Sequence, residues 1–325
     1  MLEHLKWKFV ERPFLSVGSS YVDAFPFLAL FVLLFLAGCL LKGKSAQKLR
    51  PFIQLVSFIF FIFVVHRCFC ALRGWLFGLQ EIGRSDLNVF NNLFIFVPLV
   101  AFTLIFGRVF CGWICPLGAS QEVFFRVPFL RKFLVNFSPA ARRVKLVFLA
   151  LALSITIYLL IAFKPKTFFF AENTAAFFGI LTLAMAAIFS LVPALEPRLK
   201  KMRYFFLALV IIIISIGIFI TDPWCALFGN EIDYSSLISF FAVMAAGLSV
   251  SMAWCRYICP LGAFLSLVVK SSRLKIKRNM ECALSPEAVK KICYTEALTE
   301  RGLEASSCLY CRRCVDAGAA KIEEL

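Results

Sequence analysis

Seven long apolar segments constrain this chain more than any other feature of its sequence. A helix needs roughly 20 apolar residues to cross about 30 Å of hydrocarbon, and each segment is close to that length. Hydrophobic residues make up 61% of the chain, far more than a water-soluble domain uses. The pattern predicts an all-α integral membrane protein with about seven transmembrane helices. The segments are 24–41, 51–69, 89–107, 145–163, 175–195, 203–221 and 237–254.

The basic residues between these segments predict how the chain is oriented. Taken alternately, the loops of one set carry 21 Lys and Arg residues and those of the other set carry 8. Because basic loops stay in the cytoplasm, we expect the richer set and the C-terminal tail inside and the N-terminus outside. This describes a multi-pass protein of the bacterial inner membrane, in contact with lipid. The loops also account for the net charge of +16, so nucleic acid is not expected as a partner.

A ten-residue cysteine motif occurs twice, 144 residues apart, as FCGWICPLGA at 110–119 and WCRYICPLGA at 254–263. In Cys-x3-Cys both sulfurs lie on one helix face, and the following proline should end the helix at the second cysteine. A broken helix end leaves backbone N–H groups that can bond sulfur. Packed cysteines in helix-ending turns, or redox-active dithiols, are the alternatives to metal binding. The sulfurs that could hold an iron–sulfur cluster here are Cys111, Cys115, Cys255 and Cys259.

A third cysteine group lies near the C-terminus, where Cys308, Cys311 and Cys314 have the C-x2-C-x2-C spacing that opens a bacterial ferredoxin run. Gly318 occupies the fourth position of that run, and Cys293 is the upstream candidate for the missing ligand. Four thiolates close a cubane, so we predict a [4Fe–4S] cluster in a ferredoxin-like tail, with a four-thiolate zinc site as the alternative. The expected parts are an N-terminal outer segment 1–23, a transmembrane domain 24–269 and the tail 270–325.

Four of the remaining cysteines lie at the outer edge or in the first apolar segment, and the fifth, Cys282, is left without a partner in the expected tail cluster. Cys68, Cys70 and Cys225 are expected at the outer edge, where they could complete a cluster with His66, bind copper or form a structural disulfide. Cys68 and Cys70 are a poor disulfide pair because one residue separates them. Cys39, inside the first segment, is expected to be a packed side chain.

At the paired cysteine motifs the chain resembles the NapH and NosR type of membrane-bound polyferredoxins. Further matching residues are 107–110 before the first motif, Gln121-Glu122 after it and 221–224 before the last segment. The resemblance covers most of 89–325 and implies quinol-linked electron transfer through iron–sulfur clusters. The chain departs from the family pattern in having one apparent ferredoxin cluster in place of two.

These observations predict an electron-transfer protein that works between the quinone pool or a cytoplasmic donor and a partner redox protein. We expect partner subunits such as a ferredoxin, a cytochrome or a flavoprotein, in a complex of the quinol dehydrogenase type, and a quinone could bind. No residue has the setting of a general acid or base, so no catalytic residue is predicted. The alternative is a membrane assembly or regulatory factor that reduces or delivers metal for a periplasmic metalloenzyme.

Overall fold

The computed structural model describes most of the helical part of the chain and much of the tail. The predicted N-terminal segment 1–23 and the outer residues His66, Cys68, Cys70 and Cys225 lie outside the described residues. The described residues are 24–43, 46–60, 87–126, 139–163, 174–192, 195–215, 223, 234–279, 292–293, 295–299 and 302–324.

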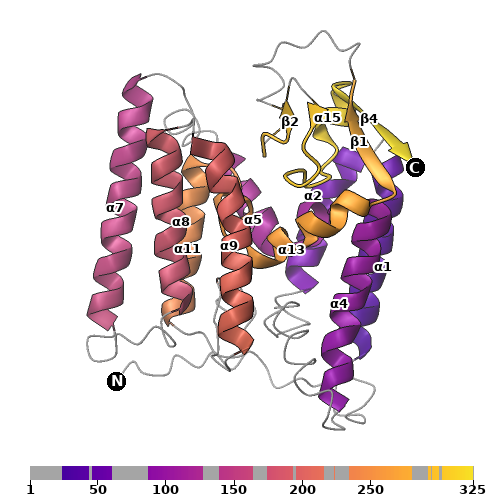
Figure 1. Ribbon diagram of the computed structural model, residues 1–325, viewed down its shortest axis with the longest axis horizontal. Helices are drawn as coiled ribbons and strands as arrows, with labels where there is room; N and C mark the ends of the chain where they lie inside the picture. The colour runs from indigo at the N-terminus through magenta and orange to yellow at the C-terminus, as the bar shows by residue number, and fades with distance from the viewer. Residues whose placement is uncertain are drawn as a thin grey trace. The chain divides into compact units, whose positions relative to one another are not determined.

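Each of the seven apolar segments overlaps a helix, so the prediction of a mostly helical protein is confirmed (Figure 1). The helices form because the segments are long apolar runs, and α2 and α4 continue through Pro51 and Pro98. Within the described residues, the stretch Arg143–Ala162 of α7 is the one that is both long and apolar enough to cross a membrane. The seven helices are α1 (Ala24–Lys42), α2 (Ala46–Phe60), α4 (Leu87–Phe106), α7 (Pro139–Phe163), α8 (Thr174–Leu191), α9 (Glu196–Ser215) and α11 (Tyr234–Ser249).

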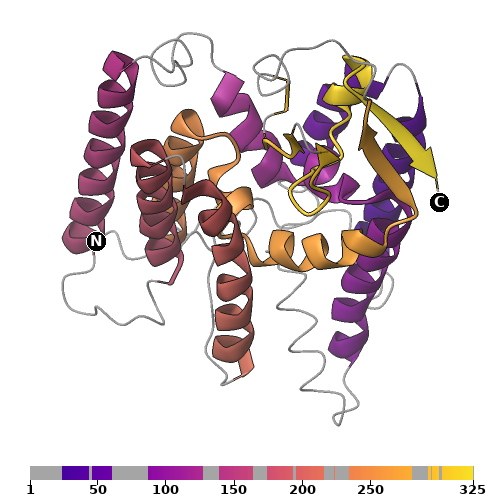
Figure 2. The same ribbon diagram turned by 45° about the horizontal axis from the view of Figure 1, so that its top comes forward.

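The chain divides into two compact units, and the described residues of 120–260 form the first. Its helices α7, α8 and α11 lie side by side, as Figure 1 and Figure 2 show. Leu160, Ala176 and Ile238 form a small apolar core, one from each helix. The Ala176 backbone N–H donates to Ser235 Oγ at 3.1 Å, which joins α8 to α11 through a polar contact. The short helix α12 (Ala253–Tyr257) also belongs to this unit.

The second unit combines α1, α2 and α4 with the described residues of 261–324. Phe31 of α1 meets Phe102 of α4 edge to face at 5.1 Å. The helix α13 (Pro260–Val268) leads through η4 (Val269–Ser271) into the tail. The Arg273 backbone N–H then donates to Leu104 O at 2.8 Å, which ties the start of the tail to α4.

The tail is a small module closed by two paired strands. The strand β1 (Leu274–Arg278) runs antiparallel to β4 (Ala320–Glu324), with Ile276 opposite Ile322. Between them stand the short pair β2 (Leu298–Thr299) and β3 (Gly302–Leu303), and the one-turn helix α15 (Arg313–Asp316). The cysteine loop 308–312 therefore lies in the stretch of chain between β1 and β4, whose pairing brings the two ends of that stretch together.

The prediction for Cys39 was wrong, because this side chain is exposed on α1. The buried face of α1 is formed by Leu34, Ala37 and Leu41, which recur at helical spacing. Cys39 is two residues from Ala37 and Leu41, so it falls on another face of the helix.

Candidate metal centre

The two cysteine motifs form turns with the same backbone hydrogen bond. The Cys115 N–H donates to Phe110 O at 2.8 Å, and the Cys259 N–H donates to Trp254 O at 2.9 Å. A new helix starts at the proline directly after each second cysteine, where a missing N–H costs nothing. The predicted break at the second cysteine is therefore confirmed for both motifs.

The first turn is a π-helical segment, η2 (Phe110–Ile114), and α2 holds its carbonyl groups. Arg50 Nε donates to Gly112 O at 2.9 Å, and Ser57 Oγ donates to Ile114 O at 2.7 Å. The Gly118 N–H lies 3.3 Å from Cys115 Sγ and points to it. As expected for a broken helix end, backbone N–H groups are thus turned toward sulfur.

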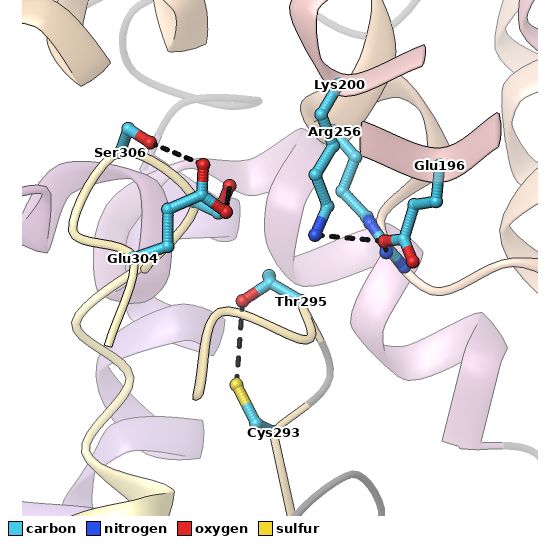
Figure 3. Close-up of polar contacts among 8 residues, drawn as sticks. Glu196, Lys200, Arg256, Cys293, Thr295, Glu304 and Ser306 are labelled. Carbon is cyan, nitrogen blue, oxygen red and sulfur yellow. Dashed lines mark hydrogen bonds and ion pairs between the residues drawn. The ribbon is translucent and has the colours of Figure 1, made fainter. Parts of the chain in front are cut away.

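Two polar side chains from elsewhere in its unit, Gln121 and Glu196, hold the second turn. Gln121 is fully buried; its Nε2 donates to Cys255 Sγ at 3.4 Å and its Oε1 accepts from the Trp254 N–H at 3.1 Å. Arg256, between the two cysteines, is ion-paired with Glu196, which also binds Lys200 at 2.9 Å (Figure 3). The Arg256 guanidinium lies 5.6 Å from the centre of the Phe189 ring, which covers its charge.

The four predicted tail cysteines lie close enough for their charges to act on one another. Burial raises the pKa of Cys308 well above its usual range, and Cys314, Cys311 and Cys293 raise it further. Burial, with the charges of Cys311 and Cys293, raises the pKa of Cys314 to about 12. The thiols of Cys308 and Cys314 are therefore protonated at neutral pH, and a metal must displace their protons on binding.

The loop that carries these cysteines has an unusual backbone. Tyr310 and Arg312 adopt positive φ angles of 53° and 67°, a region that bulky side chains rarely occupy. Each such residue costs on the order of 1–3 kcal/mol and persists only where its surroundings hold it. The Tyr310 N–H points to Cys308 Sγ at 3.4 Å, and Cys293 Sγ is 3.8 Å from Thr295 Oγ1 (Figure 3). The loop conformation thus places hydrogen-bond donors beside sulfur.

This loop packs directly on the first cysteine turn. A Cβ atom added to Gly112 would overlap the Leu309 carbonyl, so only glycine permits this approach. Trp113 Nε1 donates to Tyr310 O at 3.0 Å. Gly107, with a φ of 76°, lies against the Tyr310 ring and leaves no room for a side chain. The first motif and the tail loop are therefore one packed structure.

The donor set of the tail fits an iron–sulfur cluster, since four cysteine sulfurs are the ligands of a [4Fe–4S] cubane. The four thiolates of a cubane each bind a different iron. A single zinc ion instead holds all of its sulfur ligands about 2.3 Å from one centre. Among the residues that the structure describes, no three His, Cys, Asp or Glu side chains gather closely enough to hold a single metal ion.

Several residues at these sites were not predicted from the sequence as contributors. Glu196 and Tyr310 were given no role, and Arg108 and Gln121 were noted only as part of the family resemblance. Arg108 and Gln121 each flank the first motif, and a buried charged or amide side chain in an apolar setting is the signal that could have drawn attention to them.

Comparison with known proteins supports the iron–sulfur reading of the twin motifs. A family of 4Fe-4S binding domains matches residues 89–137 and again 232–279, and each match contains one Cys-x3-Cys-Pro motif. No solved structure matches the chain.

Three relatives illustrate the range of similar proteins. An uncharacterized protein of Methanocaldococcus jannaschii is 29% identical over 275 residues, which cover 82% of this chain and 90% of the relative. The Escherichia coli protein YccM, provisionally named as an electron transport protein, is 24% identical over 76% of this chain and 60% of its own length. The regulatory protein NosR of Pseudomonas aeruginosa is 26% identical over 65% of this chain, but the match spans only 24% of NosR.

Together, the cysteine motifs and the two domain matches define a protein of the iron–sulfur class. More narrowly, these matches support the resemblance of the chain to the NapH/NosR-type polyferredoxins.

Proposed function

We propose that this protein is a membrane-bound iron–sulfur wire that carries electrons between the quinone pool or a cytoplasmic donor and a partner redox protein. The observation that carries the proposal is that Cys293, Cys308, Cys311 and Cys314 lie close enough for their charges to interact, beside a loop that packs against the first cysteine turn. A bound [4Fe–4S] cluster would supply reversible one-electron chemistry there.

The residues of the tail perform the tasks that such a centre requires. Four thiols supply the ligands, and the buried side chains of Leu309 and Tyr310 exclude water from them. The Tyr310 N–H, directed at Cys308 Sγ, stabilises negative charge on that sulfur. Hydrogen bonds to sulfur and low exposure are the main means by which a protein sets the potential of a cluster.

The twin turns are proposed to supply a second centre through Cys111, Cys115, Cys255 and Cys259. The matches to 4Fe-4S binding domains fall on both turns, and a hydrogen-bond donor reaches sulfur in each. Since Gly118 and Gln121 donate to Cys115 and Cys255, the sulfurs are prepared to carry negative charge.

The membrane location is supported by the apolar surface of the helices. On α7 the side chains of Val147, Leu151 and Tyr158 are 68%, 58% and 70% exposed. They recur at spacings of four and seven residues and so form one stripe. A water-soluble monomer rarely shows so extended an apolar surface, whereas a helix in contact with lipid requires it. Seven spans, with the N-terminus outside and the tail in the cytoplasm, remain part of the proposal.

The test is iron and acid-labile sulfide counting on anaerobically purified protein, with EPR after reduction by dithionite. A tail cluster alone would give about four irons, and a second centre would give about eight. The variant Cys311→Ala should lose the tail signal and about four irons. Cys39→Ala, at an exposed cysteine outside all motifs, is the control and should keep both. Wild-type protein without iron, or Cys311→Ala with unchanged iron, would refute the proposal.

A second function is favoured by one observation, the similarity to a protein named as regulatory. In that case the chain would assemble or regulate a periplasmic metalloenzyme by reducing or delivering its metal. Cys68, Cys70 and Cys225 distinguish the two functions. If these residues bind copper and a quinol fails to reduce the protein, the delivery function is correct and the wire is not.

A further inference from the structure

Arg108 is a charged residue buried where the first cysteine turn meets the tail. Its exposed fraction is 1%, and it lies two residues before the segment Phe110–Ile114 of the turn. Burying a guanidinium costs several kcal/mol unless nearby groups compensate its charge. A charge retained at such a position therefore needs a reason beyond packing.

The contacts of Arg108 reach both cysteine groups of this unit. Its Nη2 lies 3.8 Å from Cys111 Sγ in the first turn. Its Nη1 donates to Ser306 O at 2.7 Å, two residues before Cys308. One cation thus contacts both the first turn and the segment that leads into the cysteine loop.

Two other buried arginines nearby are used differently. Arg50 directs its Nε to the Gly112 carbonyl, so it holds the backbone of the turn. Arg312 lies in the cysteine loop, but its Nε is 3.0 Å from Asp316, which offsets its charge. Among the three arginines, the described contact to a sulfur of a cysteine motif is made by Arg108.

We propose that Arg108 is a positioning residue whose buried charge is shared by Cys111 and the tail loop, and that it raises the reduction potential of the tail centre. Reduction adds one negative charge, and a fixed positive charge in a medium of low dielectric constant stabilises the reduced form more than the oxidised form. This inference rests on the proposed function, because it requires a redox centre in the tail.

The experiment is a redox titration of the purified full-length protein, followed by EPR, on wild type, Arg108→Gln and Arg108→Lys. Arg108→Gln removes the charge and should move the midpoint potential of the tail signal to more negative values. Arg108→Lys keeps the charge and should keep the midpoint potential close to the wild-type value. Arg203→Gln removes an equally buried charge, one whose guanidinium lies 4.9 Å from the Tyr204 ring, and should leave the potential unchanged.

A potential in Arg108→Gln that moves no further than in Arg203→Gln would overturn the inference. So would an equal shift in Arg108→Lys and Arg108→Gln, since that would indicate packing and not charge. Where Arg108→Gln fails to accumulate, Arg108→Met keeps the apolar stem without a buried polar head, and the same negative shift is expected. Absence of iron from wild-type protein would refute the proposed function, whereas a loaded protein with an unmoved potential would refute only the role of Arg108.

Discussion

The first and second cysteine turns have the same frame, yet the residue after the first cysteine has opposite uses in the two. In the first turn this residue is Gly112, and the missing side chain leaves space for the Leu309 carbonyl of the tail. In the second turn it is Arg256, a buried side chain that pairs with Glu196. The shared cysteines and prolines fix the backbone of both turns, and the residues between the cysteines decide what each turn packs against.

The difference also shows how a duplicated motif can acquire two settings. The bonds Cys115 N–H to Phe110 O and Cys259 N–H to Trp254 O are equivalent, so the turn geometry does not depend on the intervening residues. The donors described at sulfur are of two kinds, since Gly118 donates its backbone N–H to Cys115 and Gln121 donates a side-chain amide to Cys255. Potentials tuned through such donors should therefore differ between the two turns.

The largest expected effect comes from giving the first turn the residue of the second. Gly112→Arg places a bulky cation where the Leu309 carbonyl lies, so the tail loop should be displaced and the tail iron lost. Overpacking alone costs on the order of 1–3 kcal/mol, and a buried unpaired charge adds to it. Hydrogen exchange at residues 308–312 and iron content are the measurements. Gly43→Arg, at an exposed glycine, is the control, and equal exchange in both variants would contradict the prediction.

The next effect should follow from breaking the ion pair of the second turn. Glu196→Gln leaves Arg256 buried without its carboxylate, at a cost of about 3–5 kcal/mol, and should lower the Tm measured in detergent. Lys200→Gln removes only the ion pair between Lys200 and Glu196, which lie four residues apart on the same helix. Such a pair is worth about 0.5 kcal/mol, so the Tm should be nearly unchanged. If the two variants have the same Tm, the buried ion pair does not stabilise this turn.

A smaller effect is expected at Gln121. Gln121→Leu removes the donor to Cys255 and leaves the Trp254 N–H without this acceptor, which costs about 1–3 kcal/mol. The measurement is the Tm, together with the EPR signal that remains in Cys311→Ala. Val123→Ala changes an exposed side chain on the same helix, and it should match wild type in both readouts.

The smallest effect should come from Trp113→Phe, which removes one hydrogen bond to Tyr310 O. The expected cost is about 0.5–1.5 kcal/mol, seen as slightly faster hydrogen exchange in the tail loop with iron retained. Tyr257→Phe is the matched change at the same position of the second turn. It should leave exchange in the tail loop as in wild type, and equal acceleration would contradict the separate roles of the turns.

Local patterns predicted much of the fold and of the candidate site. The ferredoxin spacing predicted that Cys293 would lie near Cys308. Apolar runs predicted seven helices, α1, α2, α4, α7, α8, α9 and α11. The packing of the tail on the first turn could not be predicted, because it joins Trp113 to Tyr310 across 197 residues. Likewise, Gln121 and Cys255 are 134 residues apart, so no local pattern indicates that one donates to the other.

The packing of the tail loop on the first turn also sets an order of events during synthesis. Ribosomes add about 5–20 residues per second, so the loop emerges roughly 10–40 s after Trp113. During that interval the Gly112 backbone lacks the cover that the Leu309 carbonyl later provides. The arrival of the tail then closes this interval, so a later part of the chain completes a packed structure that begins at the first turn.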